Sequence, residues 1–160
     1  MRWVSGWRAR DQAVEADAKE LWRQLSVLPE GVDPDLRAEE ILSLAYVDDT
    51  LAAVSTAFIR EIEFLKARFA MLRCIVAPAW RHHNIARVIT GHSKGVLEAW
   101  SQAHPEERVM GMAGVVQNAE ILRNPNIGGL PIWPTSGLTL VGYTPKGEQI
   151  RVAWFEHARV

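Results

Sequence analysis

Residues 75–89, IVAPAWRHHNIARVI, place a cation and several polar side chains at the junction of two apolar segments. The first segment breaks at Pro78, polar residues run from Arg81 to Asn84, and apolar residues then recur at helical spacing. A helix that begins at the end of a strand presents unpaired backbone N–H groups and the positive end of its dipole, which together can hold a phosphate. Since Arg81 adds a full cation, the junction predicts an anion-binding site.

The adjacent histidines, His82 and His83, do not predict a metal site. Neighbouring side chains diverge by about 100° around a helix, and no other Cys or His stands beside them in the sequence. We therefore expect no metal, and we expect the two imidazoles to contact phosphate or solvent.

The elements that must position this junction follow from hydrophobic spacing. Apolar residues three and four positions apart predict helices over about 11–27 and 83–103, and a short helix over 118–124. The β-prone runs that predict strands are 40–47, 51–65, 69–77, 108–117 and the two closing segments LTLVGYT and QIRVAWFE. The segment 124–137 holds three Pro and three Gly, so we expect a loop there.

This order of elements predicts an α/β chain with a mixed sheet and helices packed on it. The helix over 83–103 should be a right-handed crossover between two parallel neighbouring strands. With 160 residues, 18.0 kDa and 48% hydrophobic residues, we expect one domain over 1–160.

Charge and composition exclude several classes of protein. Lys and Arg total 18 against 19 for Asp and Glu, so no long-range field favours nucleic acid or an anionic membrane. No stretch approaches the ~20 apolar residues of a membrane span, and the N-terminus lacks the apolar core of a signal peptide, so we expect a cytoplasmic protein. The single Cys74 excludes a disulfide framework and is expected to be a buried small hydrophobe.

At the junction the sequence resembles the GNAT superfamily of N-acyltransferases. The family's cofactor motif is an apolar strand end, one residue and Pro, followed by Arg or Gln, two residues, Gly, one residue, and Gly or Ala. Here the motif begins at Val76 and Pro78 and continues from Arg81 to Ala86, with Asn84 in place of the first Gly. Asn is the residue that, after Gly, best tolerates left-handed backbone conformations.

The resemblance covers about 35–156. The turn at 48–50 matches the family's acidic hairpin, and LTLVGYTPKG is similar to its late strand with Gly before an aromatic residue. It implies a GNAT-like mixed, mostly antiparallel central sheet of about six strands flanked by helices.

The resemblance also implies a ligand: acetyl-CoA or another acyl-CoA as co-substrate. Its pyrophosphate would be held by the amides of Arg81, His82, His83, Asn84, Ile85 and Ala86. Its pantetheine arm would run along the edge formed by Cys74, Ile75 and Val76, beside a splayed strand at 111–117. Gly111 and Gly114 fit either such a cleft or packing against a helix, and Asn118 either contacts the thioester side or caps a helix.

The reaction implied is attack of an amine on a thioester. It needs a base, a donor for the oxyanion and an acid for the departing thiolate. Backbone N–H groups near Ile75 and Val76 are the oxyanion candidates, and Tyr143 is the nearest candidate acid. Glu61 and Glu63 alternate along a predicted strand, where they either meet an amine or face water.

Alternatives remain at this stage. GHSKG, residues 91–95, has the spacing of a hydrolase nucleophile elbow but lies inside a periodic helix, where we expect its glycines to pack against the sheet. The main hypothesis is an N-acyltransferase that acts on a small-molecule or peptide amine. The alternatives are a catalytically degenerate GNAT-fold binding or regulatory module, or an enzyme that takes its acyl group from acyl carrier protein. Trp133 either covers an acceptor pocket or anchors a homodimer.

Overall fold

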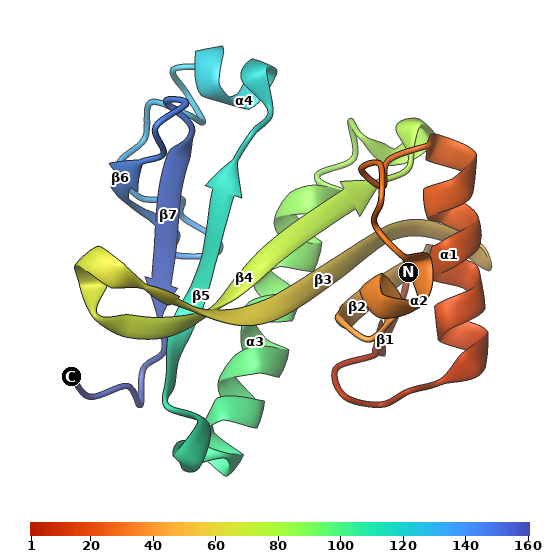
Figure 1. Ribbon diagram of the computed structural model, residues 1–160. Coiled ribbons are helices and arrows are strands. Elements are labelled where there is room, and N and C mark those ends of the chain that lie inside the picture. The colour runs from red at the N-terminus through yellow and green to blue at the C-terminus, as the bar shows by residue number, and fades with distance from the viewer. The chain divides into compact units, whose positions relative to one another are not determined.

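The computed structural model describes residues 1–160, and Figure 1 labels its α-helices and strands. In chain order they are β1 Arg2–Ser5, α1 Gln12–Leu25, α2 Pro34–Ala38, β2 Ile41–Val47, β3 Thr50–Ile62, η1 Glu63–Leu65, β4 Ala67–Val76, η2 Pro78–Trp80, α3 Ile85–Ala103, η3 Pro105–Glu107, β5 Val109–Val116, α4 Ala119–Arg123, β6 Thr139–Tyr143 and β7 Gln149–Trp154. None of the helices is long and apolar enough to cross a bilayer.

The strands form a seven-stranded mixed sheet in the order β1-β2-β3-β4-β5-β7-β6. β4 and β5 are parallel, with α3 between them in the chain, which confirms that this helix connects two parallel neighbouring strands. The pairs β1–β2, β2–β3, β5–β7 and β6–β7 are antiparallel. The fold class was thus predicted correctly, and the strand count is one above the expected six.

The additional strand is β1, which the sequence pattern did not predict. It is four residues long and pairs along its whole length with β2, from Arg2 opposite Tyr46 to Ser5 opposite Ser43. Four residues are too few for an alternating pattern to be distinguished from chance. The short helix α2 was also missed, although Asp33 caps it and Pro34 begins it, which is a helix start signal.

Contacts within the chain divide it into two compact units. The first unit comprises residues 1–57 and 73–96, and the second comprises residues 58–72 and 97–160. β3, β4 and α3 each contribute residues to both units.

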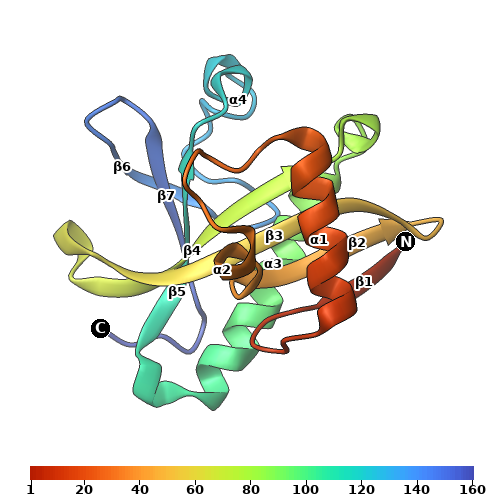
Figure 2. The same cartoon turned by 45° about the vertical axis from the view of Figure 1, so that its right-hand side comes forward.

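In the first unit, α1 packs its apolar stripe on one face of β2 and β3. Val14, Ala18, Leu21 and Trp22 are buried against a cluster that includes Leu44. Figure 2 shows α1 and α2 on the same side of these strands. Burial of such a stripe, rather than helix propensity alone, stabilises a helix of this length.

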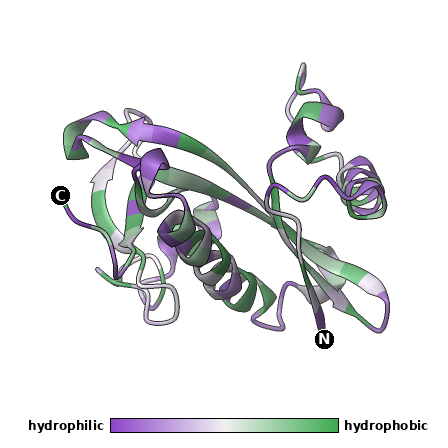
Figure 3. Cartoon of the chain, turned by 90° about the horizontal axis from the view of Figure 1, so that it is seen from below, coloured by the Kyte–Doolittle hydropathy of each residue, from purple (hydrophilic) through white to green (hydrophobic).

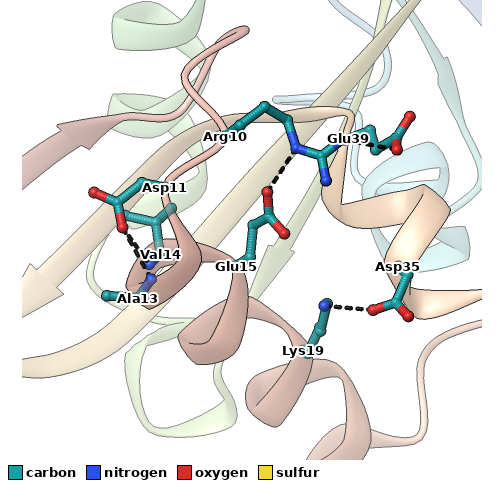
Figure 4. A network of polar contacts seen from close by, with 8 residues as sticks. All are labelled: Arg10, Asp11, Ala13, Val14, Glu15, Lys19, Asp35 and Glu39. Atoms are coloured by element: carbon teal, nitrogen blue, oxygen red, sulfur yellow. Dashed lines mark hydrogen bonds and ion pairs between the residues drawn. The ribbon is translucent and has the colours of Figure 1, made fainter.

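Polar contacts fix how α1 begins and how α2 lies beside it (Figure 4). The Asp11 carboxylate caps α1 by accepting from the amides of Ala13 at 2.9 Å and Val14 at 3.3 Å. Arg10 bridges to Glu15 at 2.9 Å and to Glu39 at 2.7 Å, and a further ion pair joins Lys19 to Asp35. Because these pairs are exposed, they orient the two helices more than they stabilise them.

The opposite face of the same strands carries small residues and contacts α3. Ala45 and Ala53 are buried with Ile85 and Ile89 of α3. Beside them, the hydroxyl groups of Ser55 on β3 and Ser93 on α3 lie 2.8 Å apart. Figure 3 shows hydrophobic and hydrophilic segments alternating along α3, as expected for a helix with one buried face.

The same hydroxyl group of Ser55 also contacts β2. It accepts from the Ser43 amide at 3.1 Å and lies 3.3 Å from the Ser43 carbonyl. His92 Nδ1 lies 3.1 Å from the Ser43 hydroxyl, and the His92 ring stacks on Trp3 at 4.8 Å. Ser93 is fully buried in the interior of α3, so it is a packing residue and not an exposed nucleophile.

The prediction that the glycines of GHSKG pack against the sheet is wrong for Gly95, which lies in the same helix. A Cβ at Gly95 would meet nothing within 4 Å, so this glycine faces open space rather than packing tightly against the sheet.

The second unit has its own core around β5 and β7. Ile62, Phe69, Ala113 and Val152 are among its buried residues. A Cβ at Gly111 would lie 2.3 Å from the Ala153 carbonyl oxygen of β7, so no larger residue fits there. Gly111 is therefore required by the close approach of the backbone of β7, and neither a cleft nor packing against a helix is needed to explain it.

Candidate functional site

The chain between β4 and α3, residues 77–84, is here called the entry turn of α3, and it lies in the first unit. The Ala77 amide still donates to the Ala52 carbonyl at 2.8 Å, which keeps the end of β4 on the sheet. Pro78 has no amide hydrogen with which to extend a ladder, and a 3-10 turn over Pro78–Trp80 follows. The strand therefore ends where the motif predicts.

Asn84 adopts the left-handed conformation, with φ of 56°. Its carbonyl accepts the Val88 amide at 3.1 Å, so Asn84 is the residue at which α3 begins. Asn84 thus adopts the left-handed conformation that Asn was expected to tolerate in place of the motif glycine. A left-handed residue here turns the chain sharply from the entry turn into the helix.

Only part of the predicted amide cradle is open to a ligand. The Arg81 amide donates to the Pro78 carbonyl at 3.4 Å, and the His83 amide donates to the Trp80 carbonyl at 3.2 Å. The amides of Ile85 and Ala86 precede the first closed turn of α3 and have no carbonyl partner within the helix. Of the six expected amide donors, those of Arg81 and His83 are therefore engaged within the turn, and those of Ile85 and Ala86, at the start of the helix, are open.

The Arg81 side chain lies beside this helix start. Its Nε donates to the carbonyl of Val76 at 3.3 Å, which ties the guanidinium to the last residue of β4. Arg81 is exposed and enters no ion pair with an acidic side chain. A cation held in this way, near open amides and the positive end of a 19-residue helix, suits a phosphate.

His82 and His83 are both exposed in the entry turn. The His83 ring meets the Trp80 ring edge to face, with centroids 5.5 Å apart. No three His, Cys, Asp or Glu side chains in the chain are grouped so as to hold a metal ion. The two imidazoles are therefore available to solvent or to a ligand at the helix start.

The three predicted edge residues of β4 alternate between its faces. Cys74 and Val76 pack on the cluster that contains Ile85 and Ile89 of α3, whereas Ile75 packs on the α1 side. Burial raises the pKa of the Cys74 thiol to about 12, so it stays protonated at neutral pH. Cys74 is thus a small hydrophobe, as predicted, and is unsuited to act as a nucleophile.

The remaining candidates lie in the second unit. The Asn118 side chain caps α4, since its Oδ1 accepts from the amides of Glu120 at 2.9 Å and Ile121 at 3.3 Å. Tyr143 is 60% exposed on β6. Glu61 lies in β3, but Glu63 lies in the 3-10 turn η1, so the two do not alternate along one strand as expected.

β5 is paired more extensively than expected. Gly111, Met112 and Ala113 pair in register with Phe69, Ala70 and Met71 of β4. The prediction of a splayed segment at 111–117 is therefore wrong for residues 111–113, which pair with β4. The β4–β5 register ends at Ala113 and does not include Gly114, Val115 or Val116.

The segment 124–138 is here called the proline loop, and it is closed by its own hydrogen bonds. Arg151 on β7, fully buried, donates to the carbonyls of Leu130 at 2.7 Å, Gly128 at 3.1 Å and Leu138 at 3.3 Å. The Arg151 guanidinium also lies 4.5 Å from the centroid of the Trp133 ring, and the Trp133 indole donates to the Ile127 carbonyl at 2.8 Å. Trp133 thus has partners within its own loop, and no pocket or dimer contact is required to explain it.

Two arginines with contacts to distant parts of the chain were missed. Arg151 and Arg73 each interrupt an apolar run, QIRVAWFE and FAMLRCIVA. A cation inside a β-prone run is rarely buried unless it is paired. An arginine within such a run was therefore the available signal that a partner lies elsewhere in the chain. Arg73 Nη1 donates to Glu40 Oε2 at 2.6 Å in the first unit.

Comparison with known proteins finds similarity only among solved structures. No protein-family model and no curated protein sequence matches this chain. Among solved structures, a GNAT-family acetyltransferase from Streptococcus pneumoniae is similar at 11% identity, over 96% of this chain and 99% of that one, with a TM-score of 0.57.

Two of the similar structures contain the coenzyme or its acetyl form. An aminoglycoside 6'-N-acetyltransferase complexed with coenzyme A matches at 12% identity over 96% of this chain and 97% of that one, with a TM-score of 0.59. Arabidopsis thaliana NAA60 in complex with acetyl-CoA matches at 14% identity, with the same coverages and TM-score. These likenesses establish a shared fold.

Proposed function

We propose that this chain, which has the GNAT fold, is an N-acyltransferase that moves an acyl group from a coenzyme A thioester to an amine. The observation that carries the proposal is the start of α3. There a left-handed Asn84, open amides and the Arg81 guanidinium form a cradle suited to a diphosphate. The chain needs no large net positive charge to bind such an anion.

In the proposed complex, Ile85 and Ala86 donate backbone hydrogen bonds to the pyrophosphate, and Arg81 adds a charge-assisted contact. Cys74, Ile75 and Val76 line the path of the pantetheine arm. Since the Cys74 thiol is protonated, no covalent acyl-cysteine intermediate is proposed, and the amine attacks the thioester directly.

In that reaction a C–N bond forms and the C–S bond breaks. The amine loses one proton and the departing thiolate gains one, so no external oxidant or reductant is needed. Backbone amides near Ile75 and Val76 are the proposed donors to the oxyanion. Glu61 or Glu63 is the proposed base, and Tyr143 the proposed acid for the thiolate.

A binding module without turnover is the second candidate. It is favoured by the engagement of the Arg81 and His83 amides within the entry turn, which leaves fewer donors for a diphosphate than the motif provides. Such a module would bind a coenzyme A derivative without releasing the free thiol.

Calorimetric titration of acetyl-CoA into the wild type and Arg81→Ala tests the proposed donor site. We expect acetyl-CoA to bind the wild type and the variant to bind about tenfold more weakly, because a charged contact to phosphate is lost. Arg123→Ala is the matched control, since exposed Arg123 also donates through Nε to one main-chain carbonyl, that of Ala119 at 3.2 Å. Equal binding by both variants, or no binding by the wild type, would contradict the donor site.

Two further measurements separate the candidate functions. Pantetheine lacks the diphosphate, so its affinity should be insensitive to Arg81→Ala if Arg81 contacts the pyrophosphate. Release of free coenzyme A in the presence of a panel of amines distinguishes an enzyme from a module that only binds.

A further inference from the structure

A recess of about 290 Å³ lies in the first unit, between the last turn of α1 and the chain that connects α1 to α2. Most of its lining is apolar and comes from Trp22, Leu28, Pro29, Val32 and Pro34. This volume is near the lower end of the range for small-molecule sites, so the recess suits a small ligand. It is here called the α1–α2 recess.

The connecting chain that forms one wall of the α1–α2 recess has a defined shape. The Val32 amide donates to the Pro29 carbonyl at 3.1 Å, which closes a turn. Gly31 within this turn has φ of 80°, a conformation that favours glycine. Asp33 then caps α2 and ends the connection. The wall is therefore formed before any ligand enters, and binding would not have to order it.

Trp22 is the most buried residue of the lining, with 3% of its surface exposed. Its indole N–H has no acceptor within the protein and is not sealed from solvent, so it is reached through the small part of Trp22 that lines the recess. A buried tryptophan usually donates its N–H to a partner. The free donor at the bottom of an apolar recess therefore points to a ligand that brings an acceptor.

The charge at the α1–α2 recess is compensated. Arg23 is the one charged residue of the lining, and it donates to both carboxylate oxygens of Glu20, at 2.8 and 2.6 Å. The hydrogen bonds from Arg23 and then from Gln24 lower the pKa of the Glu20 carboxyl to about 2, so this partner is ionised at neutral pH. Neither an anion nor a cation is therefore favoured in the recess.

We propose that the α1–α2 recess binds a small uncharged molecule that has an apolar body and a hydrogen-bond acceptor, such as the carbonyl oxygen of a ketone or an amide. The acceptor takes the Trp22 N–H, and the apolar body contacts Leu28, Val32 and the two prolines. Burial of the apolar body supplies the affinity, and the N–H supplies the selectivity. This site goes beyond the proposed acyl transfer and does not rest on it.

NMR of the isotope-labelled full chain tests the site without acetyl-CoA, because each indole N–H gives its own signal. Sequential assignment, or Trp22→Phe, identifies the Trp22 signal among those of the seven tryptophans. Cyclohexanone and N-cyclohexylacetamide should move this signal downfield and to saturation, as expected for a new hydrogen bond. For so small a probe as cyclohexanone we expect a dissociation constant of about 1 mM.

A double comparison isolates the hydrogen bond. Methylenecyclohexane has the shape of cyclohexanone with a methylene group in place of the oxygen, and it should occupy the recess without the downfield shift. In Trp22→Phe, the affinity for cyclohexanone relative to methylenecyclohexane should fall at least about threefold. The ratio cancels the different hydration of the two probes and the space that the substitution creates. An unchanged ratio overturns the role of the N–H.

A variant that fills the recess tests its location. Val32→Phe places a ring in the recess from its wall and should abolish the response of the Trp22 signal to cyclohexanone. Leu36→Phe is the matched control, because it adds the same ring on an exposed residue of α2 outside the lining, and it should retain the response. Thermal unfolding of both variants separates a blocked recess from lost structure.

Two results would overturn the proposal. A Trp22 signal that responds to neither carbonyl probe in the wild type, or that responds equally in folded Val32→Phe, removes the site. Tighter binding of cyclohexanecarboxylate than of cyclohexanone, lost in Arg23→Gln, would show that the recess selects an anion and not an uncharged ligand.

Discussion

The entry turn of α3 and the proline loop use arginine in opposite ways. In the entry turn, exposed Arg81 makes one hydrogen bond, to Val76, and the helix start beside it keeps open donors. In the proline loop, buried Arg151 donates to three main-chain carbonyls and to the Gln149 side chain. Arg81 is positioned to contact a ligand. Arg151, on β7, instead donates to the main chain of the proline loop and holds that loop in place.

The difference shows what loop composition can and cannot predict. Both segments contain Pro and polar residues. Whether their polar groups face a ligand or the protein depends on a cation that stands close in sequence in one case and thirteen residues beyond the loop in the other (151 − 138). Four variants probe this contrast through the free energy of unfolding.

Arg151→Gln should have the largest effect. The shorter side chain cannot reach all three carbonyls, and buried acceptors without donors are costly, so we expect a loss of about 3 kcal/mol. Urea unfolding measures it, and hydrogen exchange should rise across residues 124–138. Arg123→Gln on the surface of α4 is the control, and an equally small change in both variants would remove the contrast.

Asn84→Val should come second. A β-branched residue disfavours the left-handed φ of 56°, so we expect a loss of about 1–2 kcal/mol, together with weaker acetyl-CoA binding. Asn84→Gly should leave stability within about 0.5 kcal/mol and keep the binding, because Gly adopts this conformation freely. Unimpaired acetyl-CoA binding by the valine variant would show that binding does not depend on the left-handed conformation of residue 84.

Trp133→Phe should have a smaller effect, a loss of about 1 kcal/mol, because it removes the indole donor to Ile127 but keeps an aromatic ring beside Arg151. Thermal unfolding measures the shift. If Trp133 instead anchored a dimer, the variant would change the sedimentation behaviour of the protein, and stability would depend on protein concentration.

Arg81→Ala should have the smallest effect on stability, within about 0.5 kcal/mol, although it should weaken acetyl-CoA binding. A side chain with one contact to a carbonyl contributes little to folding. A large loss of stability would show that Arg81, like Arg151, mainly holds its own turn.

Local signals predicted most of the fold and the start of the candidate site. Apolar periodicity located α1, α3 and the main strands, and the left-handed Asn84 followed from its place in the motif. The role of Gly111 required knowledge of which strand lies beside it, since Ala153 of β7 determines the available space. Glu63 was misplaced because alternation alone does not reveal where a strand ends in a 3-10 turn.

Contacts between distant residues could not be predicted. Arg73 and Glu40 are 33 residues apart, and Arg151 and Leu130 are 21 apart. No spacing rule connects such pairs, because the sheet order decides which side chains meet. Arg73 and Arg151 were therefore missed, whereas Arg81, which lies within a local motif, was found.

The hydroxyl groups that join Ser55 to Ser93 imply coupled sequence change in this part of the protein. Each is fully buried, and their oxygens lie 2.8 Å apart. Replacing Ser55 by Ala leaves the Ser93 hydroxyl without this partner, whereas in Ser93→Ala the Ser55 hydroxyl keeps its contacts with Ser43. Replacing both removes the stranded Ser93 hydroxyl as well. The double variant should therefore lose less stability than the sum of the two single variants. Substitutions at residues 55 and 93 are accordingly expected to occur together.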